Sequence, residues 1–209
     1  MTISSAGKAK TIENVLVGEV WVGSGQSNMA GQAGRYAAKD HTLKKLIASA
    51  PYPSIRLMRG GPKPVWEEAS EANVSRFSAL AISFGEALHR QLDVPVGLIV
   101  GAVGGTPSHA WMPEEIFENS ERCKKEIAEF AKTYDAVRAQ KQHEAKLAAF
   151  EKAAAKAKAE GKKVRGRKPR PPVNPGESTR GGKTGGLFDR FIRSSSGYAI
   201  RGVLWDQGE

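Results

Sequence analysis

Three short loops of the sequence carry residues that could do chemistry. The first, Gly23-Ser-Gly-Gln-Ser-Asn-Met29, places Ser27 in a glycine-rich turn behind an apolar segment. The others are Gly104-Gly-Thr106 and Gln207-Gly-Glu209. A serine in the turn after a buried strand can point its hydroxyl away from the sheet, where backbone N–H groups converge. Ser27 is therefore a candidate nucleophile. The alternative is that Ser27 is the N-cap of the next helix.

The other two loops offer hydrogen-bond donors. Glycine lets a backbone approach a bound group closely because it has no Cβ, so the N–H of Gly105 is a candidate donor to a developing oxyanion. A plain sharp turn is the alternative. In the third loop Gln207 offers an amide donor and Glu209 a carboxylate, unless both are simply solvated at a strand end. Residues 101–105 do not fit the glycine spacing of dinucleotide-binding loops, which argues against such a cofactor.

Each loop follows a segment that is typical of a buried strand. Residues 15–22, 94–103 and 199–205 are rich in Val, Leu and Ile, and residues 54–58 predict a shorter strand. Residues 78–92 repeat apolar side chains at spacings of three and four, which predicts a helix. Strands that alternate with helices form right-handed βαβ units, so we expect an α/β fold with a parallel sheet and helices on both faces. The site of such a sheet lies at the carboxyl ends of its strands.

The positive charge is confined to one segment. The 209 residues include 32 Lys and Arg against 22 Asp and Glu, a formal net charge of +10. Residues 138–183 hold 14 of the basic and 4 of the acidic residues, so the rest of the chain is neutral. Residues 113–160 predict helix, and the Pro, Gly, Lys and Arg of residues 161–186 predict an extended connector. We therefore expect a helical and basic insertion at 113–186 within one domain at 11–209.

Composition excludes several classes of protein. With 40% hydrophobic residues the chain can bury a core, and its single cysteine, Cys123, cannot form an internal disulfide. The four histidines show no spacing for a metal site, and no metal is expected. No stretch approaches the roughly 20 apolar residues of a spanning helix, and the first ten residues lack the apolar run of a signal peptide. We expect no membrane span.

Together the three loops resemble those of the sialate O-acetylesterase family of carbohydrate esterases. The resemblance implies the SGNH-hydrolase fold, a flavodoxin-like three-layer α/β/α sandwich, and hydrolysis of acetyl esters on sugars. It also fits a location outside the cytoplasm. The motifs that carry it are Gly25-Gln-Ser-Asn-Met29, Val94-Pro-Val-Gly-Leu-Ile99, Gly104-Gly-Thr-Pro107, Ala110-Trp-Met112, Gly202-Val-Leu-Trp205 and Gln207-Gly-Glu209.

The resemblance implies roles for single residues. Ser27 matches the family's nucleophile. The backbone N–H groups of Ser27 and Gly105, together with the side chain of Gln207, match its oxyanion hole. The implied substrate is an acetylated carbohydrate, on sialic acid or another glycan, and no cofactor is needed. The candidate substrate contacts are Gln26, Asn28 and Glu209.

The sequence also departs from the family. The family's base and its orienting carboxylate occur as Asp-x-x-His near the end of the domain, and this sequence has no such motif. We expect a C-terminally truncated esterase domain with little activity of its own. The family usually has Leu-Tyr-Asn-Gly-Met where this chain has Leu187-Phe-Asp-Arg-Phe191, and an aromatic or aliphatic residue at Asp206. Both departures bear on the substrate contacts and on the activity that the resemblance implies.

A second hypothesis comes from the basic insertion. The chain would then be a non-catalytic module whose Lys and Arg bind an acidic polymer through salt-sensitive contacts. From Glu151 to Gly186 no aromatic residues alternate with the basic ones. Bases would have nothing to stack on, so specific recognition of nucleic acid is not expected.

Overall fold

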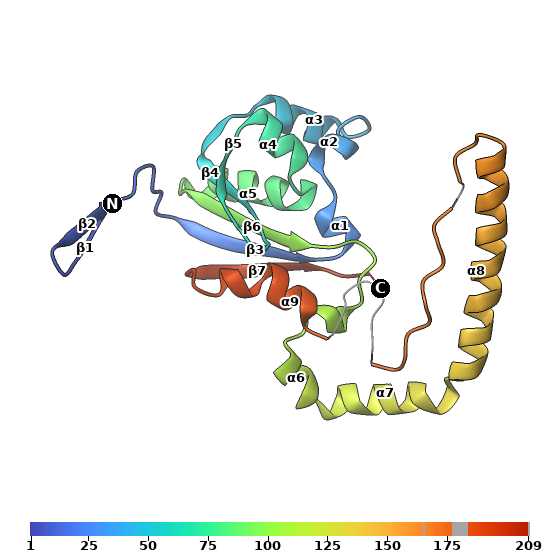
Figure 1. Cartoon of the computed structure of the whole chain (residues 1–209). Coiled ribbons are helices and arrows are strands. Elements are labelled where there is room, and N and C mark those ends of the chain that lie inside the picture. Colours follow the sequence, from blue (N-terminus) through green and yellow to red (C-terminus); the bar gives the residue numbers. More distant parts are fainter. Residues whose placement is uncertain (165, 177–183, 209) are drawn as a thin grey trace. The chain divides into compact units, whose positions relative to one another are not determined.

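The computed structural model describes residues 1–164, 166–176 and 184–208 (Figure 1). The chain divides into two compact units. One comprises Met1–Thr106 with Asp189–Glu209, and the other comprises Pro107–Phe188. The first unit contains the sheet and all three loops, and the second contains the long helices.

The first unit is built on a five-stranded sheet. Its strands lie in the order β5-β4-β6-β3-β7, and β4, β6, β3 and β7 are parallel to their neighbours. The expected α/β class with a mostly parallel sheet is thus confirmed. The exception is β5, which pairs antiparallel with β4. The strands are β3 (Glu19–Gly25), β4 (Tyr52–Arg59), β5 (Trp66–Ala69), β6 (Val96–Ala102) and β7 (Ile200–Asp206).

Helices cover one face of this sheet, and Figure 1 shows α1 to α5 together on that side. They are α1 (Ser27–Ala30), α2 (Ala33–Tyr36), α3 (His41–Ala48), α4 (Glu71–Arg76) and α5 (Ala79–Leu92). On the other face lie the end of α9 (Gly186–Phe191) and the residues after it. A Cβ placed on Gly101 would be 2.8 Å from Cβ of Phe191 and 3.0 Å from Ile192. The result is a three-layer α/β/α arrangement.

Alternation along β6 separates the two halves of the core. Val96 and Leu98 belong to the cluster under the helices, while Ile99 packs with Val22 and Met58 on the opposite face. This period of two is what a strand imposes on its side chains. Because both faces are covered, the strand shows a nearly continuous apolar run.

One expected boundary differs clearly, and the expected helix agrees with the structure. The strand expected from residue 15 begins only at Glu19, and Val17 is 88% exposed. Gly18 lies so near the neighbouring loop that a Cβ would be 2.0 Å from the carbonyl oxygen of Pro95. The expected helix is α5, where the Ser78 side chain accepts the N–H of Ala81 and caps the helix start. Asp93, in the left-handed conformation, ends it.

A small hairpin precedes the sheet. It pairs β1 (Thr2–Ser5) with β2 (Lys8–Thr11) in antiparallel fashion, and every residue of both strands is exposed. Ala6 and Gly7 form the turn with positive φ angles of 46° and 74°, as two-residue hairpin turns of the I′ type require.

The second unit is mainly helical. It contains a short 3-10 helix (Ser108–Trp111), α6 (Glu114–Glu118), α7 (Glu121–Thr133) and α8 (Ala136–Ala159). The expected helical segment is therefore broken twice. At each break a new N-cap appears, because Ser120 accepts the N–H of Cys123 and Asp135 accepts that of Arg138. In the part of the chain that the structure describes, no helix has the length and apolar character to cross a membrane.

Candidate functional site

The three loops meet at the carboxyl ends of β6, β3 and β7. Gly25, the last residue of β3, lies opposite Ala102 of β6 and Asp206 of β7. Backbone hydrogen bonds continue beyond the strands: Gln26 N–H donates to the carbonyl of Asp206 at 3.0 Å, and Val103 N–H donates to that of Gly25 at 3.2 Å. The loops are thus fixed to one another by main chain as well as by side chains.

Gly25 makes this convergence possible. Its φ is +126°, and a Cβ at this position would lie 2.0 Å from the carbonyl oxygen of Asp206. Any other residue would meet both a strained backbone and a backbone clash. The glycine therefore brings β7 against the first loop.

Ser27 is exposed and is the first residue of α1. The N-cap of α1 is Gln26, and no side chain forms a capping hydrogen bond there. The alternative interpretation of Ser27 as the N-cap is therefore wrong. Gly104 of the second loop lies against it, since a Cβ on Gly104 would be 3.2 Å from the Ser27 Cβ. The structure thus leaves the Ser27 hydroxyl at the surface, beside the glycine loop.

The neighbours of Ser27 differ from each other. Asn28 is exposed, whereas Gln26 is only 5% exposed. The Gln26 Oε1 atom accepts the N–H of Gly105 at 3.3 Å, and a Cβ on Gly208 would lie 3.2 Å from its Nε2 atom. Gln26 therefore lies between the second and third loops and links them. Sequence reasoning proposed it as a substrate contact and missed this supporting position.

Gln207 is held by the second loop. Its Nε2 atom donates to the carbonyl oxygen of Thr106 at 2.7 Å. Thr106 is itself buried, and its hydroxyl donates to the carbonyl of Val103 at 2.7 Å. A rigid loop thus positions the amide. Glu209 lies outside the described residues, and Asp206 is half-buried at the end of β7.

Among the described residues, Ser27 Oγ forms no hydrogen bond with a histidine or a carboxylate. The histidines of the first unit have other places. His41 is the first residue of α3, and His89 Nδ1 lies 2.8 Å from the carbonyl oxygen of Val94, where α5 ends and β6 begins. In the second unit, burial lowers the pKa of His109 below its usual 6.5.

Comparison with known proteins identifies the family. Residues 17–153 match the family model described as carbohydrate esterase, sialic acid-specific acetylesterase. Over 118 residues the chain is 30% identical to the sialate O-acetylesterases of Homo sapiens and Pongo abelii, which covers 48% of this chain and 22% of each relative. The match to the Rattus norvegicus enzyme is 27% identical over 128 residues, 53% of this chain and 23% of that one.

The chain therefore corresponds to less than a quarter of the length of these relatives. A crystal structure of a carbohydrate acetylesterase from Xanthomonas citri matches the whole chain and 37% of its own, with a TM-score of 0.57 at 19% identity, and it shares the fold. Since the family model spans well over half of the residues, this chain belongs to the sialic acid-specific acetylesterase family of carbohydrate esterases.

Proposed function

We propose that the chain carries the nucleophile of a carbohydrate O-acetylesterase, and that Ser27 is that nucleophile. One observation carries the proposal: in a chain of an acetylesterase family, Ser27 is an exposed serine where three strand-end loops meet. Its neighbour Asn28 is also exposed and is a candidate contact for the sugar. The proposed substrate is an acetyl ester on a sugar hydroxyl.

The reaction would proceed in two steps. The Ser27 Oγ attacks the acetyl carbonyl carbon, the bond to the sugar oxygen breaks, and the sugar leaves as the alcohol. Water then hydrolyses the acetyl-enzyme to acetate and free serine. Both steps need a general base beside Ser27. The family resemblance implies a histidine held by a carboxylate for that role.

Three donors would stabilise the oxyanion: the N–H groups of Ser27 and Gly105 and the Nε2 of Gln207. In the structure the Gly105 N–H donates to Gln26 Oε1 at 3.3 Å, which is long for an N–H···O bond. A charged oxyanion is a stronger acceptor than a neutral amide oxygen. It would take over this donor, and Gln26 would hold the loop in place between turnovers.

A serine-reactive fluorophosphonate probe tests the proposal in the full-length protein, where the histidine and carboxylate that the family resemblance implies would activate Ser27. We expect the label on Ser27, located by mass spectrometry of peptides, and loss of labelling in Ser27→Ala. Ser49→Ala is the matched control, since Ser49 is an exposed serine of the same unit at the end of α3. Hydrolysis of an acetylated sugar should fall to background in Ser27→Ala only. Labelling of another serine, or equal hydrolysis by both variants, would contradict the assignment.

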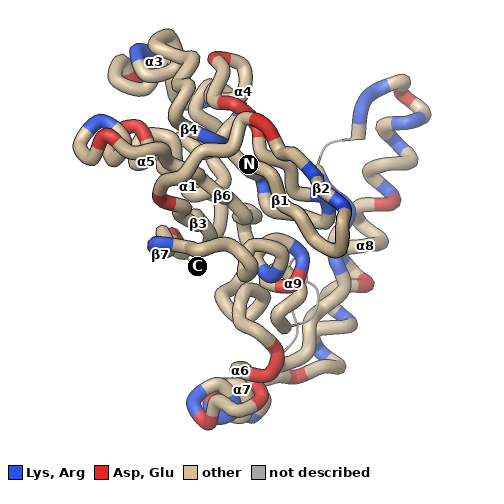
Figure 2. The backbone as a smooth tube through the Cα atoms, turned by 90° about the vertical axis from the view of Figure 1, so that its left-hand side faces the viewer, with Lys and Arg blue, Asp and Glu red and all other residues tan. Residues whose placement is uncertain are grey.

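One feature of α8 favours a second function, binding of an acidic polymer. Lys and Arg recur along the helix, as the blue parts of the tube in Figure 2 show, and all of them are exposed. Arg138, Lys141, Lys152 and Lys156 fall within about 60° of one another at 100° per residue, on the side opposite a half-buried stripe. That stripe consists of Ala139, His143, Leu147, Phe150, Ala154 and Ala157.

Heparin serves as the anionic probe for this second function. Lys152→Glu with Lys156→Glu should weaken heparin binding and flatten its dependence on salt, because fewer counterions are released. The control is Lys44→Glu with Lys45→Glu, two exposed lysines of α3. Equal loss in both double variants would show general charge attraction instead of a role for α8.

A further inference from the structure

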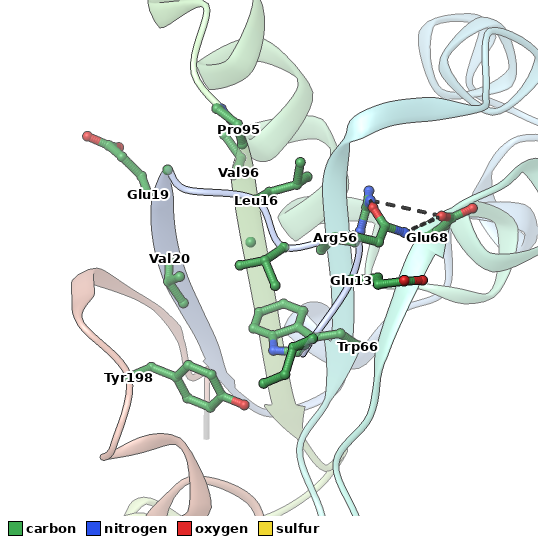
Figure 3. Close-up of a pocket in the computed structure, with 15 residues that line it drawn as sticks. Glu13, Leu16, Glu19, Val20, Arg56, Trp66, Glu68, Pro95, Val96 and Tyr198 are labelled. Atoms are coloured by element: carbon green, nitrogen blue, oxygen red, sulfur yellow. Dashed lines mark hydrogen bonds and ion pairs between the residues drawn. The ribbon is translucent and has the colours of Figure 1, made fainter. Parts of the chain in front are cut away.

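A pocket of about 480 Å³ lies at the opposite end of the sheet from Ser27 (Figure 3). It is lined by the first residues of β3 and β6, by β5, by the segment before β3 and by Tyr198. Val20 lines it, and β3 rises about 3.3 Å per residue from there toward Ser27. The two places are roughly 20 Å apart along the strand. This pocket is therefore separate from the candidate ester site.

Two aromatic residues form one wall. The rings of Trp66 and Tyr198 meet edge to face, with centroids 5.7 Å apart at 89°. Gly97 leaves room for the indole, since a Cβ there would be 3.0 Å from the ring. Within the described residues neither the indole N–H nor the phenol hydroxyl forms a hydrogen bond. Both polar groups can therefore donate to a ligand.

A fixed polar cluster forms the other wall. The Arg56 guanidinium donates to the Asn14 Oδ1 at 2.6 Å and to the carbonyl of Pro53 at 2.7 Å, and its side chain is 15% exposed. Asn14 Nδ2 donates to the Glu68 carboxylate at 2.9 Å, and Arg56 lies 3.9 Å from the same oxygen. Figure 3 shows the contacts made by the Glu68 carboxylate as dashed lines. Arg56 is thus already neutralised, and the acceptors beside it are held in place.

The charge of the lining selects the ligand. Glu13, Glu19 and Glu68 line the pocket together with a single Arg56. Glu19 is engaged outside it, by Arg201 at 3.5 Å and by the indole N–H of Trp21 at 3.0 Å. The surplus of carboxylates disfavours an anion. An apolar partner is disfavoured too, because it would remove the Glu13 carboxylate from water, and among the described residues no donor contacts that carboxylate.

We propose that this pocket binds a neutral saccharide. The faces of its rings carry C–H groups that pack on the aromatic wall, and its hydroxyls accept from Trp66 Nε1 and the Tyr198 hydroxyl and donate to the Glu13 and Glu68 carboxylates. The volume lies in the range of small-ligand sites, roughly 300 to 1,000 Å³. We propose binding in this pocket and no reaction. The inference does not depend on the assignment of Ser27 as the nucleophile.

The test uses the 209-residue chain with Ser27→Ala, so that no ligand is altered during titration. The neutral probes are xylohexaose, cellohexaose and mannohexaose, and the anionic probe is trigalacturonate. Binding is measured by calorimetry and by the NMR signal of the Trp66 indole N–H, assigned from its loss in Trp66→Phe. We expect at least one neutral probe to shift that signal and to bind at least tenfold more tightly than trigalacturonate.

The variants locate the ligand. Trp66→Phe and Tyr198→Phe each remove one donor and keep a ring, so each should weaken binding about five- to tenfold. Tyr36→Phe, which changes an exposed tyrosine of α2, should leave binding unchanged. Thermal unfolding shows whether Trp66→Phe still folds. If it does not, the affinity of Tyr198→Phe tests the proposal, because Tyr198 is more exposed and its replacement disturbs the fold less.

Three results would overturn the proposal. The first is no response to any of the neutral probes. The second is binding that is equal in Tyr198→Phe and Tyr36→Phe, since the ligand would then lie elsewhere. The third is trigalacturonate that binds as tightly as the neutral sugars, since the carboxylates of the lining would then play no part in selection.

Discussion

Replacing Gly25 with alanine should loosen β7 from the sheet, because Gly25 is where β7 and the first loop come closest. The new Cβ would be placed 2.0 Å from the Asp206 carbonyl oxygen, whereas ordinary contacts start at 3.4 Å. The Cβ and the carbonyl oxygen must therefore move apart by well over 1 Å. Because the oxygen belongs to the backbone, only a movement of the backbone can provide this distance. The hydrogen bond from Gln26 N–H to that carbonyl, now 3.0 Å, would break.

The size of the effect follows from two contributions. Holding alanine at a φ of +126° costs about 1 to 3 kcal/mol. Losing the Gln26 hydrogen bond costs about 1 kcal/mol more. Together they lower the free energy of unfolding by about 3 kcal/mol, which corresponds to a fall in Tm of roughly 6 to 12 °C for a chain of this size.

Gly23→Ala is the matched control, two residues earlier on the same face of β3. Its Cβ would meet the Met29 sulfur at 3.0 Å, a flexible side chain that can turn aside, so the cost should be about 1 kcal/mol. Urea unfolding measures both variants, and hydrogen exchange should show faster exchange of β7 amides in Gly25→Ala alone. Equal destabilisation, or unchanged protection of β7, would refute the reasoning.

Three further predictions concern single residues. Gly104→Ala should displace Ser27 by a few tenths of an ångström and slow its labelling by fluorophosphonate about three- to tenfold, with less than about 1 kcal/mol lost in urea unfolding; an unchanged rate would contradict the contact. Asp93→Gly should raise the free energy of unfolding by about 0.5 to 1 kcal/mol, because Asp93 ends α5 at a φ of 53°, and a decrease would count against this. His109 should titrate below 6.5 by NMR, because burial lowers its pKa. The unfolded chain then binds the proton more tightly, so stability is fully present above about pH 6.5 and declines as the pH falls; a midpoint above 6.5 would contradict this.

Strong periodicity explains what the sequence could predict of the fold. The apolar repeat before Asp93 has the spacing of a helix and is long enough to exclude a strand. The apolar run of β6 is short and continuous, as expected for a buried strand. β5 has no such signal: Trp66-Glu-Glu-Ala69 shows no clear alternation, and pairing with β4 decides its conformation. Val15 to Val17 shows the reverse case. These residues are typical of a strand, yet they are exposed and β3 begins only at Glu19, because among the described residues they pair with no neighbouring strand.

The candidate site was predicted to a similar extent. The loop positions follow from parallel strands, and sequence reasoning placed Ser27 in one of these loops because it follows a strand. Its role as the nucleophile stays a prediction. The position of Gln26 depends on the Gly105 N–H, 79 residues further along, and no local pattern shows such a contact. The breaks at Ser120 and Asp135 are different. Both are good N-cap residues within the helical segment, and that signal was available in the sequence.

β7 lies beside β3 in the sheet but far from it along the sequence, and this affects how the site is assembled. The unit that carries all three loops is made from two pieces of chain, with residues 107–188 between them. During synthesis the first two loops are complete long before Gln207 emerges, so the exposed edge of β3 must wait for β7. Closing the connection costs conformational entropy that grows with its length. Shortening the connection tenfold would reduce this cost by roughly 2 kcal/mol. Insertion length is thus a kinetic variable for the folding of this sheet, because it sets how long the edge of β3 that pairs with β7 stays open to aggregation.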